Sequence, residues 1–161
     1  MAREQLLIAD AGPLITLAAI GRFELLRDLA SEVVVPRCVF EEVIAGAPRP
    51  GAVEIRADWI RVAEAKQELA DAFALMIDRG EAEALALAKE LPAALLVIDD
   101  LRARRVAAEL GLRFTGTLGI LNLAKRAGMV DTLRAEIENL RGAGFHITEA
   151  MAAEFLRLAG E

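Results

Sequence analysis

The amino-acid sequence predicts an α/β fold of three layers, in which a central parallel β-sheet lies between two layers of helices. Short apolar runs of strand length alternate along the chain with helical patterns, which is typical of parallel sheets with helical crossovers. Two of these runs, at 6–9 and 94–98, lead directly into acidic residues. The length of 161 residues fits one domain. We therefore expect a single domain over residues 1–161, with 130–161 as a C-terminal helical extension.

The expected strands are short apolar segments bounded by residues that break secondary structure. Pro36 ends one of them, and Trp59 opens a segment whose alternation suits a half-buried edge strand. The expected strands cover residues 6–9, 32–35, 59–62, 94–98 and 112–115.

The expected helices carry apolar residues at helical spacing between these strands. Gly21 interrupts the first of them, Gly111 stops another, and a break at 78–80 separates two more. Thr148 is the expected N-cap of the last helix. The helical segments are 14–29, 37–45, 52–58, 66–77, 81–91, 100–110, the stretch after 116–119 as far as 128, 130–140, and a final helix that follows a short segment at 145–147.

The charge balance limits the classes of function. The chain has 19 Lys and Arg against 25 Asp and Glu, a net charge of −6, which argues against a protein that coats nucleic acid by bulk attraction. A nuclease is compatible with this charge, because acids gathered around a metal ion lower the net charge while a local basic rim contacts phosphates.

Cysteine and histidine are scarce, since Cys38 and His146 are the single examples of each. Both are explained more simply by packing than by chemistry. One Cys with one His makes neither an intrachain disulfide nor a structural zinc site, so any metal is expected to be bound by oxygen. No apolar run reaches the roughly 18 residues of a membrane span, and no export signal is evident, which predicts a cytoplasmic protein without membrane contact.

Acidic residues follow two of the expected strands: Asp10 comes after 6–9, and Asp99 with Asp100 after 94–98. Parallel strands place their carboxyl ends at one edge, where ligands bind, so these carboxylates should meet if both strands are central. Asp10 taken alone could equally be a helix N-cap. Adjacent carboxylates at a buried strand end repel each other unless a cation lies between them. One of Asp99 and Asp100 could cap the next helix while the other binds metal, and strand direction favours neither.

Two pairs of glutamates on the expected helices are further candidates. The residues four and seven positions after Glu81 are apolar, which places Glu81 at the start of a buried stripe, whereas Glu83 is followed by a wetter face. Glu81 is therefore favoured, although acids are also common in the first turn of a helix without any site. The helical pattern does not decide between Glu41 and Glu42.

Basic and small residues surround the second acidic corner. Arg102, Arg104 and Arg105 form a run that is ordinarily solvated, but one of them could reach the acids or a phosphate. The segment 115–119 lacks the Lys and the glycine spacing of a phosphate loop. Thr117 is expected to cap the following helix, or else these small residues form a rim that lets a backbone approach the acids.

Ordered pieces of the sequence resemble a PIN-domain protein, in the group related to the toxin nucleases of bacterial and archaeal toxin-antitoxin pairs. The pieces cover most of the chain and are 10–15, 35–43, 80–88, 98–107 and 116–119. The resemblance implies a three-layer PIN-like fold and a metal-dependent ribonuclease. It also implies RNA as the substrate and an antitoxin protein as the partner. A homodimer is also expected, because the Ala- and Leu-rich helices offer more apolar face than one sheet can cover.

The resemblance also implies site residues. Matched by position, Asp10 is the first-strand Asp, Glu42 the helix Glu, Glu81 the third acid, and Asp99 with Asp100 the last. Two residues depart from the pattern: toxin members typically carry Asp at position 81, and Ser or Thr often follows the first Asp where this chain has Ala.

Carboxylates of this kind suit phosphodiester hydrolysis, which needs an activated water and neutralisation of charge in the transition state. Mg²⁺ or Mn²⁺ held by carboxylates supplies both. Asp10 and Asp100 are expected to bind the ion directly, Glu42 and Glu81 directly or through water, and Asp99 to support them. No Ser, Cys or His arrangement for nucleophilic catalysis competes.

Two other functions are compatible with acids at strand ends. The first is a catalytically weak PIN-like module that acts by binding a partner protein. The second is a receiver-like phosphoacceptor domain, which needs a Lys near the sheet edge. The three lysines of the chain are not at strand ends, so the phosphoacceptor ranks low.

Overall fold

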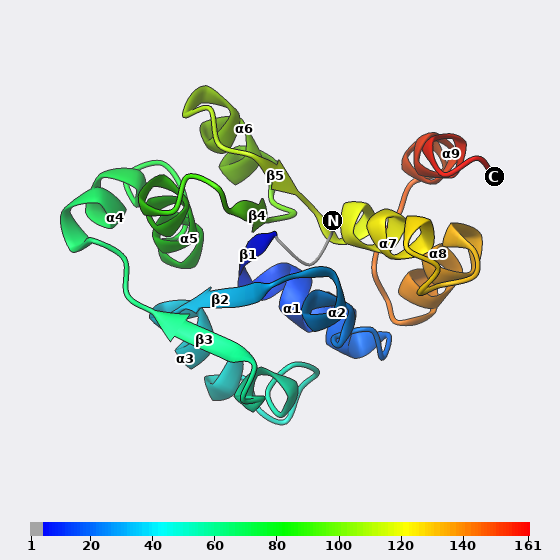
Figure 1. Cartoon of the computed structure of the whole chain (residues 1–161), viewed down its shortest axis with the longest axis horizontal. Coiled ribbons are helices and arrows are strands. Elements are labelled where there is room, and N and C mark those ends of the chain that lie inside the picture. Colours follow the sequence, from blue (N-terminus) through cyan, green and yellow to red (C-terminus); the bar gives the residue numbers. More distant parts are fainter. Residues whose placement is uncertain (1–4) are drawn as a thin grey trace.

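The computed structural model describes residues 5–161 and contains one five-stranded sheet in which every pairing is parallel. The strand order is β3-β2-β1-β4-β5, so β1 lies at the centre (Figure 1). The chain adds β2 and β3 on one side of β1, then crosses over and adds β4 and β5 on the other side. The strands are β1 Leu6–Ala9, β2 Glu32–Pro36, β3 Ile60–Ala63, β4 Leu95–Val97 and β5 Phe114–Thr115.

Helices cover both faces of the sheet, which confirms the predicted three layers. One apolar cluster joins the sheet to α1, α2 and α7, and the other joins it to α4, α5 and α6. Figure 1 shows α4 to α6 on the opposite side of β1 from α1 and α2. The helices are α1 Ala11–Ala19, α2 Leu25–Leu29, α3 Arg37–Ala45, α4 Gln67–Phe73, α5 Arg79–Glu90, α6 Leu101–Glu109, α7 Thr117–Arg126, α8 Leu133–Gly142 and α9 Glu149–Leu158, with a 3-10 turn η2 at Glu54–Arg56.

Strand register explains how β1 serves both clusters. Leu7 pairs with Val33, and both belong to the cluster of α1, α2 and α7. Ile8 pairs with Val34, and both belong to the cluster of α4 to α6. Successive side chains of a strand point to opposite faces, so a central strand covered on both sides is apolar at every position. This is why residues 6–9 read as a continuous apolar run.

Several helices begin at different residues from those expected. The N-terminus of α1 is Ala11, not residue 14, and that of α7 is Thr117. The N-terminus of α5 is Arg79, not Glu81, because Gly80 continues the helix and does not break it. The N-terminus of α8 is Leu133, three residues later than expected, because the Thr132 hydroxyl accepts a hydrogen bond from the Ala135 N–H and caps the helix there. The Thr148 cap of α9 is confirmed, since its hydroxyl accepts from the Met151 N–H.

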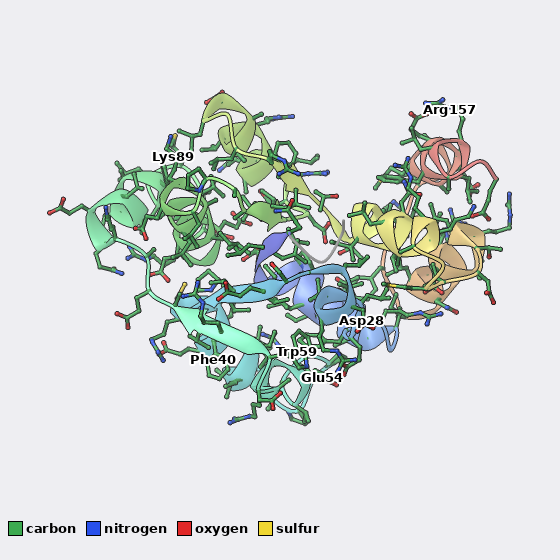
Figure 2. All side chains as sticks on the ribbon, in the orientation of Figure 1. Asp28, Phe40, Glu54, Trp59, Lys89 and Arg157 are labelled. Atoms are coloured by element: carbon green, nitrogen blue, oxygen red, sulfur yellow. The ribbon has the colours of Figure 1, made fainter. Side chains whose placement is uncertain are left out.

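The last two helices extend the layer that contains α1, α2 and α7. Glu136 of α8 is buried and forms a two-point ion pair with Arg22, with N···O distances of 2.6 and 3.1 Å. Buried residues of α8 and α9, including Ile137 and Ala152, belong to the same apolar cluster as β1. Arg157, in contrast, lies on the outer side of α9 (Figure 2).

No helix within residues 5–161 is both long and apolar enough to cross a membrane.

Candidate metal centre

A cavity of about 210 Å³ opens at the carboxyl edge of the sheet, where β1 and β4 lead into α1 and α6. Six of the side chains that line it are carboxylates, and none is cationic. The cavity is lined by Asp10, Ala11, Gly12, Pro13, Glu42, Asp78, Gly80, Glu81, Asp99 and Asp100. The structure thus brings together all five predicted site residues.

Asp10 lies at the centre of this edge because β1 is the central strand. Its N–H donates to the Val97 carbonyl at 3.1 Å, which extends the β1–β4 pairing by one residue. It occupies the N-cap position of α1, and its side chain makes no capping hydrogen bond to that helix within the described part of the chain. The carboxylate is 8% exposed and directed into the cavity. The capping interpretation of Asp10 therefore does not account for its side chain.

Asp99 and Asp100 have different hydrogen-bond partners. Asp99 accepts two hydrogen bonds from one residue: the Thr117 N–H donates to Oδ1 at 2.8 Å, and the Thr117 hydroxyl donates to Oδ2 at 2.7 Å. Asp100 caps α6, since its Oδ1 accepts from the Ala103 N–H at 2.9 Å. Capping uses one oxygen of Asp100, and Thr117 fixes both oxygens of Asp99. The expectation that one of the two acids caps the next helix is confirmed for Asp100, while Asp99 is held by Thr117.

Thr117 also differs from its predicted role. Gly116 occupies the N-cap position of α7, and Thr117 is the first helical residue. Its backbone and side chain both bind Asp99, so Thr117 connects α7 to the end of β4 instead of capping its own helix. A Cβ on Gly116 would lie 2.5 Å from Asp99 Oδ1 and 3.3 Å from the Ile98 carbonyl oxygen. Only glycine leaves room for this contact.

Glu42 and Glu81 reach the cavity from α3 and α5. Gly80 lets α5 approach α3 closely, because a Cβ at that position would lie 3.2 Å from Val39 Cγ2. Glu81 sits in the first turn of α5, where its Oε2 accepts from the Asp78 N–H at 3.3 Å. Glu42 lines the cavity and Glu41 does not. The structure therefore decides between these two glutamates, which the helical pattern did not.

The burial predicted for α5 is wrong. Glu83, not Glu81, is the buried glutamate, at 7% exposed. All residues from Ala82 to Ala88 are buried, because α5 packs on the sheet and also contacts α4 and α6. A helix that is buried on most sides has no single solvent-exposed face. The spacing of its apolar residues therefore does not predict which of its acidic residues is the more buried. Glu83 pairs with Arg79 at 3.3 Å and lies outside the acidic cavity.

The gathered carboxylates raise the pKa of two members. The pKa of Asp10 rises from 3.8 to about 6, mainly through burial and further through repulsion by Glu42, Asp99 and Asp100, while the Ala11 N–H lowers it. The pKa of Glu81 rises from 4.5 to about 7, again mainly through burial, then through repulsion by Asp100 and Asp10. Both shifts reflect burial first and the neighbouring carboxylates second.

The donor chemistry of the cavity fits Mg²⁺ or Mn²⁺, which prefer carboxylate and water oxygens. Among residues 5–161, no group of three or more His, Cys, Asp or Glu side chains is arranged so that it could hold an ion as it stands. Mg²⁺ commonly keeps several of its waters and takes only one or two carboxylates directly. The donor set of the cavity therefore suits an ion that is bound partly through water.

Cys38 and His146 take no part in the acidic cavity. Burial, and then its contact with Glu83, raises the pKa of the Cys38 thiol to about 12, so the thiol stays protonated at neutral pH. His146 is exposed and lines a second cavity. Arg104 lines that second cavity too, whereas Arg102 and Arg105 line neither. Cys38 is half-buried, in agreement with a packing role, whereas the exposed position of His146 shows that the packing interpretation of this residue is wrong.

Sequence reasoning missed Asp78 and Thr117 as neighbours of the acids. Asp78 stands three positions before Glu81, and this spacing is the capping-box pattern that marks the start of a helix with its first-turn Glu. That pattern could have placed the helix start correctly. No local signal identifies Thr117 as the partner of Asp99, because the two are 18 residues apart and meet only through the pairing of β4 with β5.

A comparison with protein families finds a match over residues 6–161 to the family DUF3368, described as a PIN domain. No curated protein matches the chain. PIN domains are generally nucleases and usually use divalent metal ions, so the match assigns a nuclease-type fold to the chain. The acids at the carboxyl edge of a parallel sheet and the match over nearly the whole chain lead to one conclusion: this protein belongs to the PIN-domain family.

Proposed function

We propose that this protein is an endoribonuclease that depends on Mg²⁺ or Mn²⁺ and hydrolyses phosphodiester bonds. The observation that carries the proposal is the cavity at the carboxyl edge, which six carboxylates line without one cationic side chain. Concentrated carboxylates that raise each other's pKa are stabilised by a divalent cation. Family membership supports hydrolysis of nucleic acid as the reaction class.

Asp10, Glu42, Glu81 and Asp100 would hold the ion. When bound, the ion neutralises the phosphate and lowers the pKa of a water that attacks phosphorus. Asp10 is central and buried, so it contributes the most strongly oriented charge. Asp100 presents the oxygen that the Ala103 N–H does not use.

Asp99 is a positioning residue in this proposal. Thr117 holds both of its oxygens, so its negative charge is fixed beside Asp10 and contributes to the field at the site. The same contact fixes the start of α7 at the edge of the cavity. Glu42 and Glu81 keep longer side chains that can bind the ion directly or through water.

The test is cleavage of single-stranded RNA by purified protein in the presence of Mg²⁺ or Mn²⁺, with EDTA as the negative control. Asp10→Asn and Glu42→Gln should each lower kcat/KM at least about 100-fold, because each removes a charged ligand. Glu41→Gln is the matched control for Glu42, since Glu41 lies next to it outside the cavity. Cleavage that persists in Asp10→Asn with unchanged rate would reject the proposal.

We further propose that the protein is the toxin of a toxin-antitoxin pair, acts on cytoplasmic RNA, and works as a homodimer. Induced expression should then arrest growth, and Asp10→Asn should abolish the arrest without lowering the amount of protein. Coexpression of the small protein encoded beside it should restore growth. Growth arrest by Asp10→Asn equal to that by the unaltered chain would contradict a toxic nuclease.

The alternative is a catalytically weak module that acts through a partner protein, and the replacement of Asp by Glu at position 81 gives it support. Calorimetric titration with Mn²⁺ separates the two functions. Measurable binding that Asp10→Asn abolishes supports the nuclease. Absence of both metal binding and cleavage supports the module.

A further inference from the structure

A second cavity, of about 370 Å³, adjoins the acidic one. Asp99 lines both cavities, and Thr117, which holds Asp99, lines the second. The walls come from segments far apart in the sequence: the start of α6, β5, the start of α7, and the region from the end of α8 into α9. Figure 1 shows α9 beyond α7, on the side toward α6 and β5. The residues that line this cavity include Leu101, Arg104, Phe145, Met151 and Phe155.

This cavity differs from the acidic cavity in chemistry. Its wall is mainly apolar and aromatic, through residues such as Phe145 and Phe155. Leu101 and Met151 are 67% and 44% exposed, so the surface beside it is also apolar. Its volume lies within the range of small-molecule sites, about 300–1,000 Å³, which accommodates a nucleoside.

Arg104 gives the cavity a charged group without a partner. Its guanidinium carbon lies 5.2 Å from the centre of the Phe114 ring, so a cation–π contact orients it. Its Nε is buried and has no hydrogen-bond partner in the described part of the chain. Arg104 also makes no ion pair among residues 5–161. A cationic side chain in a mainly apolar wall suits a ligand that stacks on the guanidinium or offers it acceptors.

We infer that this second cavity binds the base of the RNA nucleotide next to the bond that is cleaved, with Arg104 as the residue that recognises it. The inference rests on the proposed ribonuclease function and adds a specificity subsite to it. Unstacked bases of single-stranded RNA stack on aromatic rings and on Arg planes, and they offer acceptors at their edges. A phosphate at the acidic cavity would place a neighbouring base within reach of this second cavity, because Asp99 separates the two.

A nucleotide suits this cavity better than an apolar protein segment. An apolar segment would cover the Arg104 guanidinium, which forms no ion pair among residues 5–161, and burying that charge is costly. A base either stacks on the guanidinium or accepts a hydrogen bond from it, so the charge keeps a partner. The C-terminal extension takes part directly, because Phe145, Met151 and Phe155 all belong to it.

The first experiment measures binding without cleavage. Asp10→Asn protein is labelled with ¹³C at the methionine methyl groups and titrated, with Mg²⁺ present, with each of the four nucleoside 5′-monophosphates. The Met151 methyl signal should shift in a saturable way, because the ring current of a base acts on it. Met76 and Met129 lie outside the cavity and their signals should not shift.

Introducing Arg104→Leu into the Asp10→Asn protein should weaken nucleotide binding about tenfold, as expected for the loss of one stacking partner. Arg105→Leu, on the same helix but outside the cavity, is the matched control.

The second experiment measures base preference during cleavage of an RNA library with random sequence. The unaltered chain should prefer one base, or one class of base, beside the cleaved bond. Met151→Glu places a carboxylate at the cavity and should lower that preference and kcat/KM at least about fivefold. Met129→Glu, a similarly exposed methionine outside the cavity, should change neither.

The outcomes separate the subsite from the proposed function. RNA cleavage with an unmoved Met151 signal and unchanged preference in Arg104→Leu overturns the subsite and leaves the nuclease standing. A Met151 shift that depends on Arg104, without any cleavage, supports a nucleotide site and rejects the ribonuclease. A Met151 shift caused by an apolar helical peptide but by none of the nucleotides overturns the subsite in favour of a protein-docking surface.

Discussion

Asp10 is buried among other carboxylates, and its pKa of about 6 has a consequence for stability. Its pKa is 3.8 in the unfolded chain, so between about pH 4 and pH 6 the folded state binds more protons than the unfolded state. The free energy of unfolding therefore falls as pH rises through this window. Glu81 acts in the same direction, over a window that extends to about pH 7.

Asp10→Asn should consequently stabilise the metal-free protein at neutral pH, by about 2 kcal/mol. The advantage over the unaltered chain should vanish near pH 4, where both states of Asp10 are protonated. Urea unfolding in EDTA at several pH values measures this difference, and Asp28→Asn, on the exposed surface of α2, is the control. An Asp10→Asn protein that is less stable than the unaltered chain at pH 7 in EDTA would contradict the pKa shift.

Gly116 permits the contact between Thr117 and Asp99. Gly116→Ala puts a Cβ 2.5 Å from Asp99 Oδ1, so either the carboxylate or the start of α7 must move. We expect a loss of at least about tenfold in RNA cleavage, because displacements of about 1 Å at a site are costly. Gly142→Ala is the matched control: its Cβ would meet nothing within 4 Å, and it should retain full activity. Equal activity of both variants would show that the Thr117–Asp99 contact does not position the site.

At the scale of elements, one buried ion pair joins α8 to the segment between α1 and α2. The Glu136 side chain is 3% exposed and accepts from two nitrogens of Arg22, which lies between α1 and α2. Arg22→Met would leave this carboxylate buried without a partner, at a cost of about 3 kcal/mol. Thermal or urea unfolding measures the loss.

Two variants control this prediction. Arg157→Met removes an exposed pair on α9 and should leave the melting temperature unchanged. The double variant Arg22→Met with Glu136→Leu removes both charges and should recover most of the stability, because an apolar pair can replace a buried ion pair. A double variant as unstable as Arg22→Met would mean that packing, and not the unpaired charge, causes the loss.

The corners between strands and helices could be predicted from the sequence. Asp10 and Asp100 each end a short apolar run and start a helix, so the position of each carboxylate follows from local pattern alone. Which glutamate of α5 is the more buried could not be predicted from the sequence. Glu83 is buried because α4, α6 and the sheet surround α5 together, and the pattern of one helix carries no information about how many neighbours it has.

For the whole molecule, the apolar cluster around α1 and α7 continues into α8 and α9. Residues 130–161 therefore contribute to the same core as β1, although they lie outside the sheet. We predict that the full chain unfolds in one cooperative transition, with calorimetric and van't Hoff enthalpies that agree. Two resolved transitions, one of them abolished by removing residues 130–161, would show that the extension is an independent unit.

The sequence by itself determined the fold class and the edge at which the acids gather. Alternating strand and helix patterns imply a parallel sheet, and a parallel sheet places every strand-terminal acid at one edge. These conclusions need only the order of short segments, because chain connectivity and handedness restrict how such segments assemble.

Tertiary structure alone decided which carboxylate oxygens remain available and what surrounds them. Thr117 holds Asp99 across 18 residues of chain, Gly80 lets α5 approach Val39 of α3, and the second cavity joins Arg104 to Phe155. Each of these contacts depends on the relative placement of elements distant in sequence. Hydrogen bonds and close packing act over a few ångströms in space, whereas periodicity records only which side of its own element a residue occupies.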